Sequence, residues 1–207
     1  MNEQLPEWSK EVFQGLVYWI GYKQQLYNHY PIREGEIVGE TLALLSSKID
    51  NTFRINAEVM YKNLVDDWDN NQRADIVISQ KNEIFDYKKD SLFVIEVKRK
   101  EAPESEVAKD LERLAKLKDK NKNLRCFLLY VSPNEKPKYV SDLGIASREI
   151  IYLENNYIAK VRQVKKALSQ FYTLKDGKKV EHAVEKAHYA CFIEIGKEDN
   201  KTLERNS

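Results

Sequence analysis

The sequence predicts a mixed α/β fold, because amphipathic helical segments are interleaved with short apolar runs that have the composition of strands. Apolar residues recur at helical spacing in residues 6–29, 35–49 and 105–118. Runs rich in β-branched and aromatic residues are typical of strands, and they occupy residues 53–61, 73–79, 92–98 and 124–132. We therefore expect an N-terminal helical layer, a sheet, and a helix that connects two of its strands.

The three predicted helices differ in how they begin and end. Pro6 suits the first turn of the first helix, and Pro31 disfavours helical conformation at Tyr30, which ends that helix. The second and third helices are defined by apolar stripes, formed by Ile37, Val38, Leu42, Leu45 and Ile49 in one, and by Val107, Leu111, Leu114 and Leu117 in the other.

The C-terminal part has weaker patterns. The stretch from 149 to 174 predicts a helix over roughly its second half, residues 187–195 predict a last strand, and the polar end after them is expected to fray. Repeats, low-complexity segments and linkers are not found, so we expect a single domain over residues 1–207. Its core would span about 36–132, with 6–29 and 149–195 as additions.

Composition limits the classes of protein. The 207 residues are 42% hydrophobic and 32% charged with a net charge of +1, which is typical of a globular protein. A nucleic-acid partner would have to be bound by a local basic patch. Cys126 and Cys191 lie in apolar runs without a CxxC pair, so we expect buried thiols in a reducing compartment. We find no signal peptide and no membrane-spanning segment, and we expect a cytoplasmic protein.

The run "DSLFVIEVKRK", residues 90–100, places charges in a buried strand. Side chains alternate along a strand, so Glu96 and Lys98 share one face. An unpaired charge in a core costs several kcal/mol. If residues 73–79 and 92–98 form an antiparallel hairpin, Asp75 falls opposite Glu96. The sequence therefore predicts two carboxylates side by side with an ammonium group close by.

Two carboxylates that lie this close repel each other unless a cation lies between them. Hard oxygen ligands suit Mg²⁺, and Mn²⁺ could substitute for it. A lysine beside such an ion can orient or deprotonate an attacking water, which the metal makes more acidic. These parts predict a phosphodiester hydrolase. A structural alternative also stays open, namely a salt-bridged cluster on a solvated sheet edge.

The two segments "RADIVIS" and "LFVIEVKRK", followed by a helix and a strand, resemble the PD-(D/E)XK nuclease superfamily. The resemblance assigns the first acid of the motif to Asp75, preceded by Ala74 instead of proline, and the E-x-K to Glu96, Val97 and Lys98. It implies a restriction-endonuclease-like α-β-β-β-α-β core and metal-dependent hydrolysis of double-stranded DNA. It further implies Asp75, Glu96 and the backbone carbonyl of Val97 as metal ligands.

Many members of this superfamily carry another glutamate on the helix before the first core strand. Glu40 is the best match, with Glu36 one turn earlier as its competitor, and a solvent-facing role for Glu40 is equally compatible with the sequence. The helix after the E-x-K lacks the Q-x-x-x-Y signature of nucleases attached to helicases. We therefore expect a free-standing, site-specific endonuclease of restriction type.

Two basic segments are candidate DNA contacts. Arg99 and Lys100 follow the E-x-K directly and could meet phosphates near the scissile bond. Four further basic residues have almost no acidic counterweight and could follow a DNA backbone, although an ordinary helix surface would look the same: Lys160, Arg162, Lys165 and Lys166.

Cleavage of both strands at a symmetric site favours a homodimer, with the aromatic N-terminal helix or the C-terminal region as its interface. We expect no nucleotide cofactor, because no glycine-rich phosphate-binding motif is present. Three alternatives remain open. They are a repair, junction-resolving or mobile-element nuclease, a non-cleaving module that binds nucleic acid or protein, and a structural subunit.

Overall fold

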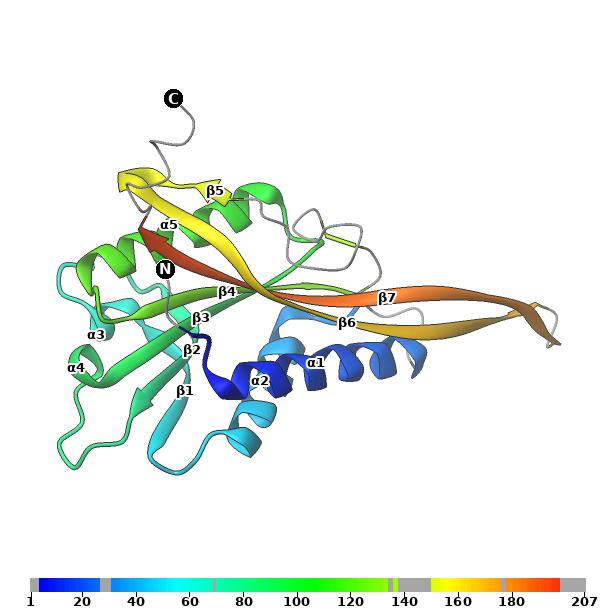
Figure 1. The fold of residues 1–207 in the computed structure, drawn as a ribbon, viewed down its shortest axis with the longest axis horizontal. Helices are drawn as coiled ribbons and strands as arrows, with labels where there is room; N and C mark the ends of the chain where they lie inside the picture. Colours follow the sequence, from blue (N-terminus) through cyan, green and yellow to red (C-terminus); the bar gives the residue numbers. More distant parts are fainter. Residues whose placement is uncertain are drawn as a thin grey trace.

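The computed structural model contains one seven-stranded sheet with helices on both faces (Figure 1). It describes residues 4–26, 31–68, 70–133, 136–137, 150–175 and 178–197. The strands are β1 (Phe53–Met60), β2 (Arg73–Gln80), β3 (Ser91–Arg99), β4 (Arg125–Ser132), β5 (Ile150–Tyr152), β6 (Tyr157–Lys175) and β7 (Lys178–Lys197), in the order β1-β2-β3-β4-β7-β6-β5.

Helices α1 (Glu7–Leu26) and α2 (Glu34–Lys48) cover one face of the sheet, and α5 (Glu104–Lys120) covers the other. Three short elements complete the description, namely α3 (Tyr61–Leu64), α4 (Tyr87–Asp90) and the 3₁₀ turn Glu154–Asn156. The run from α2 to β4 gives the predicted α-β-β-β-α-β order of a restriction-endonuclease-like core, and this prediction is confirmed.

The strand directions follow from the connections. β2 and β3 form an antiparallel pair with Ile76 opposite Ile95, as the predicted hairpin requires. β3 and β4 are parallel and are joined through α5, since a parallel pair needs a crossover connection. The remaining neighbours are antiparallel, including the long β6–β7 pair.

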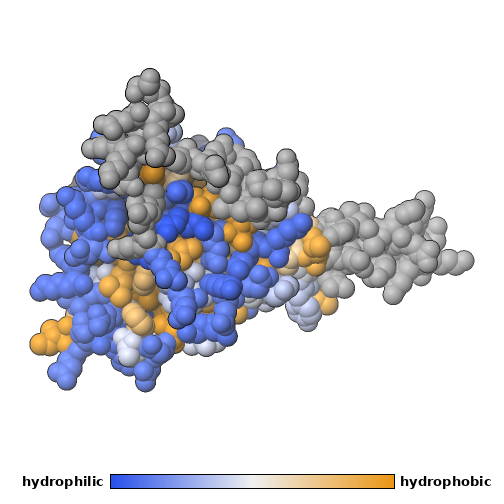
Figure 2. All heavy atoms as spheres, in the orientation of Figure 1, coloured by the Kyte–Doolittle hydropathy of each residue, from blue (hydrophilic) through white to orange (hydrophobic). Residues whose placement is uncertain are grey.

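Alternating side chains create two apolar layers. On the α1–α2 face, Ile76, Ile95, Val97 and Phe127 are fully buried, whereas Val94 and Leu128 face α5. Figure 2 shows that the coloured surface is mostly hydrophilic, as expected when apolar side chains lie between the layers. No helix among the described residues is both long and apolar enough to cross a bilayer.

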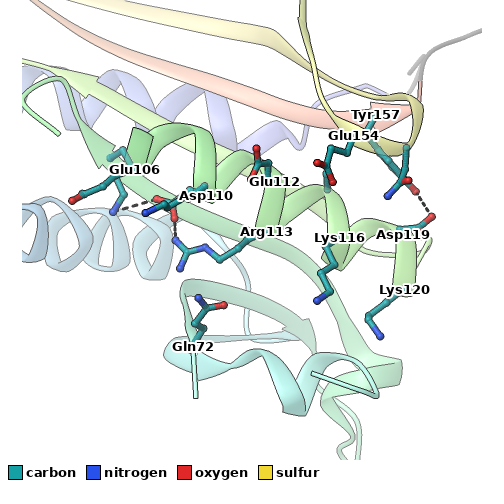
Figure 3. Close-up of a pocket in the computed structure, with 14 residues that line it drawn as sticks. Gln72, Glu106, Asp110, Glu112, Arg113, Lys116, Asp119, Lys120, Glu154 and Tyr157 are labelled. Atoms are coloured by element: carbon teal, nitrogen blue, oxygen red, sulfur yellow. Dashed lines mark hydrogen bonds and ion pairs between the residues drawn. The ribbon is translucent and has the colours of Figure 1, made fainter. Parts of the chain in front are cut away.

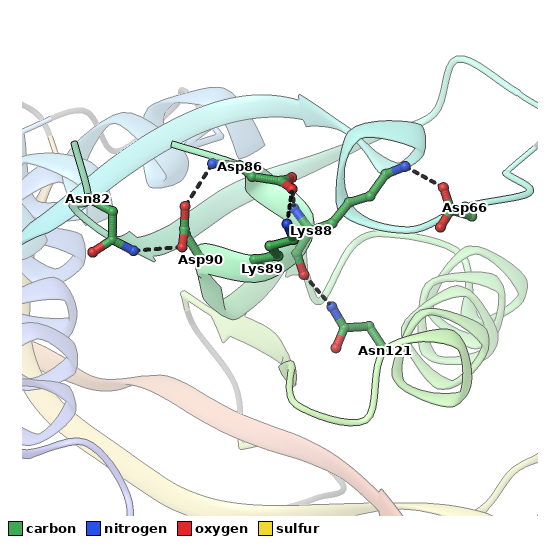
Figure 4. Close-up of polar contacts among 7 residues, drawn as sticks. All are labelled: Asp66, Asn82, Asp86, Lys88, Lys89, Asp90 and Asn121. Atoms are coloured by element: carbon green, nitrogen blue, oxygen red, sulfur yellow. Dashed lines mark hydrogen bonds and ion pairs between the residues drawn. The ribbon is translucent and has the colours of Figure 1, made fainter. Parts of the chain in front are cut away.

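Polar contacts fix the connection between β2 and β3 at one end of the sheet (Figure 4). Asp90 accepts hydrogen bonds from the Asn82 side chain at 2.6 Å and from the Asp86 backbone N–H at 2.7 Å. Asn121, which follows α5, donates to the Lys88 carbonyl at 3.1 Å, and Lys88 also pairs with Asp66. Hydrogen bonds and an ion pair therefore fix the β2–β3 connection at this end of the sheet.

The predicted C-terminal helix is wrong, because residues 157–175 form strand β6. Tyr157, Ala159 and Val161 pack in the core on the α5 side of the sheet, with the period of two that a strand requires. Their partner β7, the predicted last strand in a longer form, supplies the backbone hydrogen bonds. Helical spacing further along the segment was outweighed by this pairing. Of the predicted frayed end, residues 198–207 lie outside the described residues.

Candidate functional site

Asp75, Glu96 and Lys98 come together on the α5 face, at the end of β2 and β3 opposite to their connection. The paired register of these strands ends at Ile76 and Ile95. There the Asp75 carboxylate accepts a hydrogen bond from the Val97 N–H at 2.7 Å. This carboxylate therefore takes over a backbone donor at the point where the ladder stops.

Glu96 is a carboxylate held inside the protein, only 3% exposed. The hydroxyl of the fully buried Tyr61 donates a hydrogen bond to it. Burial raises the pKa of Glu96 to about 8, against the opposing effect of the positive charges of Arg113 and Lys98. Burial also raises the pKa of Asp75 to about 6, although the Val97 hydrogen bond lowers it. Both acids thus lie where desolvation disfavours their charged forms.

Lys98 is fixed between two acids from two different helices. Its Nζ lies 3.0 Å from Glu34 Oε1 at the start of α2 and 3.2 Å from Asp110 Oδ2 in the middle of α5. The lysine side chain is 14% exposed and that of Asp110 is 1% exposed. Asp110 also pairs with Arg113, as Figure 3 shows. The ammonium group therefore has a defined position.

Strand β1 brings a further acid to this end of the sheet. The register pairs Ala57 with Ile76 and Val59 with Ala74, which leaves Glu58 level with Asp75. Glu58 has a φ of 55°, a left-handed conformation that is uncommon for a residue with a side chain and that clusters at functional sites. The negative charges of Glu58 and Glu34 raise the pKa of both Asp75 and Glu96.

The predicted helical glutamate is not the one that reaches Lys98. Glu40 is half-buried and has no contact with Asp75, Glu96 or Lys98 among the described interactions. Glu36 accepts the Arg33 N–H at 2.8 Å and so caps α2. The contact comes instead from Glu34, which the sequence analysis missed.

Tyr61, Glu58 and Asp110 were also missed, and only Asp110 had a clear signal. It lies three residues after Val107 and four before Leu114, inside the apolar stripe of its helix. A carboxylate in that position is expected to have a buried partner.

The donor atoms at this site are chemically compatible with a small divalent ion. Among the described residues no three histidine, cysteine or acidic side chains form a ready-made metal cluster. The hydrogen bonds from Val97 and Tyr61 each use one oxygen of Asp75 and of Glu96, so each carboxylate keeps a second oxygen. Together with the Val97 carbonyl these are hard oxygen ligands, and Mg²⁺ needs only one or two carboxylates.

The predicted DNA contacts are divided between the two faces. Arg99 donates to the Ile32 carbonyl and lies 3.6 Å from Glu101, so it ties β3 to the start of α2. Lys100 is half-buried, and its backbone N–H donates to the Val131 carbonyl. Both residues directly follow Lys98 in the chain.

The β6 residues lie further from that centre. Lys160 is opposite Glu194, which binds Arg162, and these groups are on the α1 face. Lys165 is opposite Ala190 on that face as well, whereas Lys166 lies 6.0 Å over the Tyr189 ring on the α5 face. The structure therefore does not bring the four β6 residues together with Lys98.

A groove of 750 Å³ runs along α5 and begins at the site (Figure 3). Lys98 and Asp110 line one part of it, and Lys116, Lys120 and Tyr157 line another.

Cys126 and Cys191 are both buried free thiols, as predicted, and burial raises the pKa of each to about 12. Neither is a nucleophile at neutral pH.

Comparison with known proteins does not assign this chain to a family. No family model matches the chain, and no curated protein matches it. Among solved structures, the chain is similar to NucC from P. aeruginosa ATCC27853 in its cAAA-bound form, with 16% identity and a TM-score of 0.34. The match covers 56% of this chain and 52% of NucC, about half of each. The fold described above therefore rests on the element order and the strand register of this chain alone.

Proposed function

We propose that this protein is a divalent-metal-dependent endonuclease that hydrolyses phosphodiester bonds in double-stranded DNA. One observation carries the proposal. Two acids with raised pKa values, Asp75 and Glu96, share a face with Lys98 at the point where the β2–β3 ladder ends. Removing two carboxyl groups and an ammonium group from water costs stability, so a role in chemistry explains them better than a role in folding.

Each residue has a defined part in the proposed reaction. Asp75, Glu96 and the Val97 carbonyl would hold Mg²⁺, or Mn²⁺ in its place. When bound, the ion supplies a Lewis acid and lowers the pKa of a water ligand. Glu34 and Asp110 fix the Lys98 ammonium, which would orient the attacking water. Tyr61 fixes the Glu96 carboxylate in one orientation. Glu40 stays an untested candidate.

The finer assignments are also proposals. A restriction-type, site-specific and cytoplasmic enzyme that acts as a homodimer is supported only by the sequence, through the missing Q-x-x-x-Y signature and the symmetry argument. A repair, junction-resolving or mobile-element nuclease would use the same site. Arg99 and Lys100 directly follow Lys98 in the chain, and for that reason alone they could contact phosphates next to the scissile bond.

A cleavage assay with matched variants tests the proposal. Supercoiled plasmid and phage DNA are incubated with the protein in Mg²⁺ and, separately, in chelator. Asp75→Asn should abolish cleavage, and so should the chelator. Asp67→Asn is the control, because Asp67 is exposed, has a φ of 56°, and asparagine tolerates that conformation.

The products separate the remaining possibilities. Discrete fragments indicate a site-specific enzyme, whereas nicking or smearing indicates a less selective nuclease. If the wild type and Asp75→Asn bind DNA equally and neither cleaves it, the protein is a binding module and the proposed function is wrong.

A further inference from the structure

Strands β6 and β7 continue beyond the rest of the sheet as a two-stranded arm, formed by residues 167–175 and 178–188 (Figure 1). The neighbouring strand β4 pairs with β7 only from Tyr189 to Ile195, so it does not accompany the arm. At its base the arm packs into the body, where Ala167 and His188 are buried. A lone two-stranded ribbon is marginally stable in water, so a bound partner would stabilise the arm.

The arm leaves the sheet at the same end as the candidate site. Lys98 pairs with Tyr130, Tyr130 with Cys191, and Cys191 with Val164, three residues before the arm begins. Three inter-strand steps separate Lys98 from that level of β6, or about 14 Å. A ligand that extends sideways from Lys98 across this end of the sheet therefore meets the base of the arm.

The arm and the residues that lead into it carry an excess of positive charge. Residues 165–186 contain six lysines against three acidic residues, while the whole chain has a net charge of only +1. At the tip, Lys175 is paired with Lys178, and Lys179 is next along β7. The sequence of the tip therefore has more lysines than acidic residues, which suits a polyanionic partner.

The dimensions of the arm fit duplex DNA. The major groove is about 12 Å wide and admits a two-stranded β-ribbon. Nine residues of β6 in the arm span roughly 30 Å at 3.3 Å per residue, which is close to one turn of the duplex. We propose that the arm binds the duplex beside the cleavage site, with the three tip lysines on backbone phosphates. This inference rests on the proposed function in taking DNA as the substrate.

Charge reversal at the tip tests the inference. The variant Lys175→Glu, Lys178→Glu, Lys179→Glu is compared with Lys81→Glu, Lys89→Glu, Lys122→Glu, which changes the net charge equally at the opposite end of the sheet. Binding to a labelled 30-base-pair duplex is measured by fluorescence anisotropy in chelator, over a range of salt. The arm variant should bind at least tenfold more weakly, with a log–log salt slope shallower by about 2 to 3. The control should stay within threefold of wild type.

The same three lysines changed to glutamine keep the test valid if charge reversal disturbs the arm, and this variant should show the same direction with a smaller effect. Equal binding by the wild type and both arm variants overturns the inference. So does a change from dimer to monomer in light scattering with unchanged DNA affinity, because the arm would then contact a second copy.

Cleavage of the supercoiled plasmid and phage DNA in Mg²⁺, measured beside duplex binding, separates the two proposals. Arm-dependent binding without any cleavage supports the arm and overturns the nuclease. Cleavage with normal binding by both arm variants supports the nuclease and overturns the arm. A wild-type protein that neither binds nor cleaves overturns both.

Discussion

The two faces of the sheet are built for different purposes. On the α1–α2 face the core is aromatic, and Phe127 stacks on Phe192 at 4.2 Å between ring centroids with Phe13 at 4.4 Å beyond it. The buried carboxylate on this face, Glu194, is neutralised by Arg125 and Arg162. On the α5 face the apolar layer reaches one end of β3 and then gives way to the buried Glu96 and Asp110.

This difference shows where the protein gains stability and where it loses it. Burying a phenylalanine contributes about 1.5 to 3 kcal/mol. Burying a carboxylate disfavours its charge, as the raised pKa of Glu96 indicates. Both faces belong to the same strands. Burial of apolar side chains on the α1–α2 face therefore offsets the free energy that is lost by burying Glu96 and Asp110 on the α5 face. Substitutions at the site on the α5 face should therefore lower activity more than stability, and substitutions in the core of the α1–α2 face should lower stability more than activity.

The largest effect should follow from Lys98→Met. Methionine keeps the length of the stem but removes the ammonium group between Glu34 and Asp110. We expect the single-turnover cleavage rate in Mg²⁺ to fall by about 10² to 10⁴ with the protein still folded. Lys62→Met, an exposed lysine of α3, is the control. A rate within threefold of wild type would remove Lys98 from the mechanism.

Phe192→Ala should have the reverse effect of Lys98→Met, lowering stability while leaving activity nearly unchanged. Phe192 is fully buried in the aromatic stack, so its truncation should destabilise the protein by about 3 to 5 kcal/mol in urea unfolding. The cleavage rate per folded molecule should hardly change. Leu168→Ala, at an exposed leucine, should change stability by less than about 1 kcal/mol. Loss of activity without loss of stability in Phe192→Ala would contradict the division between the faces.

Glu96→Gln should lower activity but raise stability at high pH. The folded pKa of about 8 exceeds the usual 4.5, so the folded state keeps a proton that the unfolded state releases. This stabilisation is fully present below pH 4.5 and is lost as pH rises to 8. Glutamine avoids the loss, so in chelator the variant should gain on the order of a few kcal/mol at pH 9 and little at pH 4. If Glu96→Gln and the wild type had the same melting curve at pH 9 as well as at pH 4, the pKa of Glu96 would not be raised in the folded protein.

The smallest effect should come from Tyr61→Phe, which removes only the hydroxyl that donates to Glu96. We expect a loss of about 1 to 2 kcal/mol in stability and an increase of about tenfold in the Mg²⁺ concentration needed for half-maximal rate. The DNA affinity in chelator should not change. Tyr18→Phe, at an exposed tyrosine, controls for loss of a phenol. An unchanged Mg²⁺ requirement would limit Tyr61 to a role in packing.

Much of the candidate site could be predicted from local sequence. The period of two along a strand is a property of the backbone, so Glu96 and Lys98 had to share a face once residues 92–98 were assigned as a strand. The antiparallel hairpin then brought Asp75 to them, because a short connection leaves few registers that keep Ile76 and Ile95 in the core.

The sequence by itself determined the three long helices, the core strands and the placement of Asp75 near Glu96, because each depends on periodicity or on a short connection. Only the tertiary structure decided the rest. Lys98 meets Glu34 across 64 positions of the chain, and no local pattern encodes that contact. Residues 157–175 became a strand because β7 lies beside them. Contacts between distant segments depend on how whole elements pack, and that packing outweighs the weak preferences of a single segment.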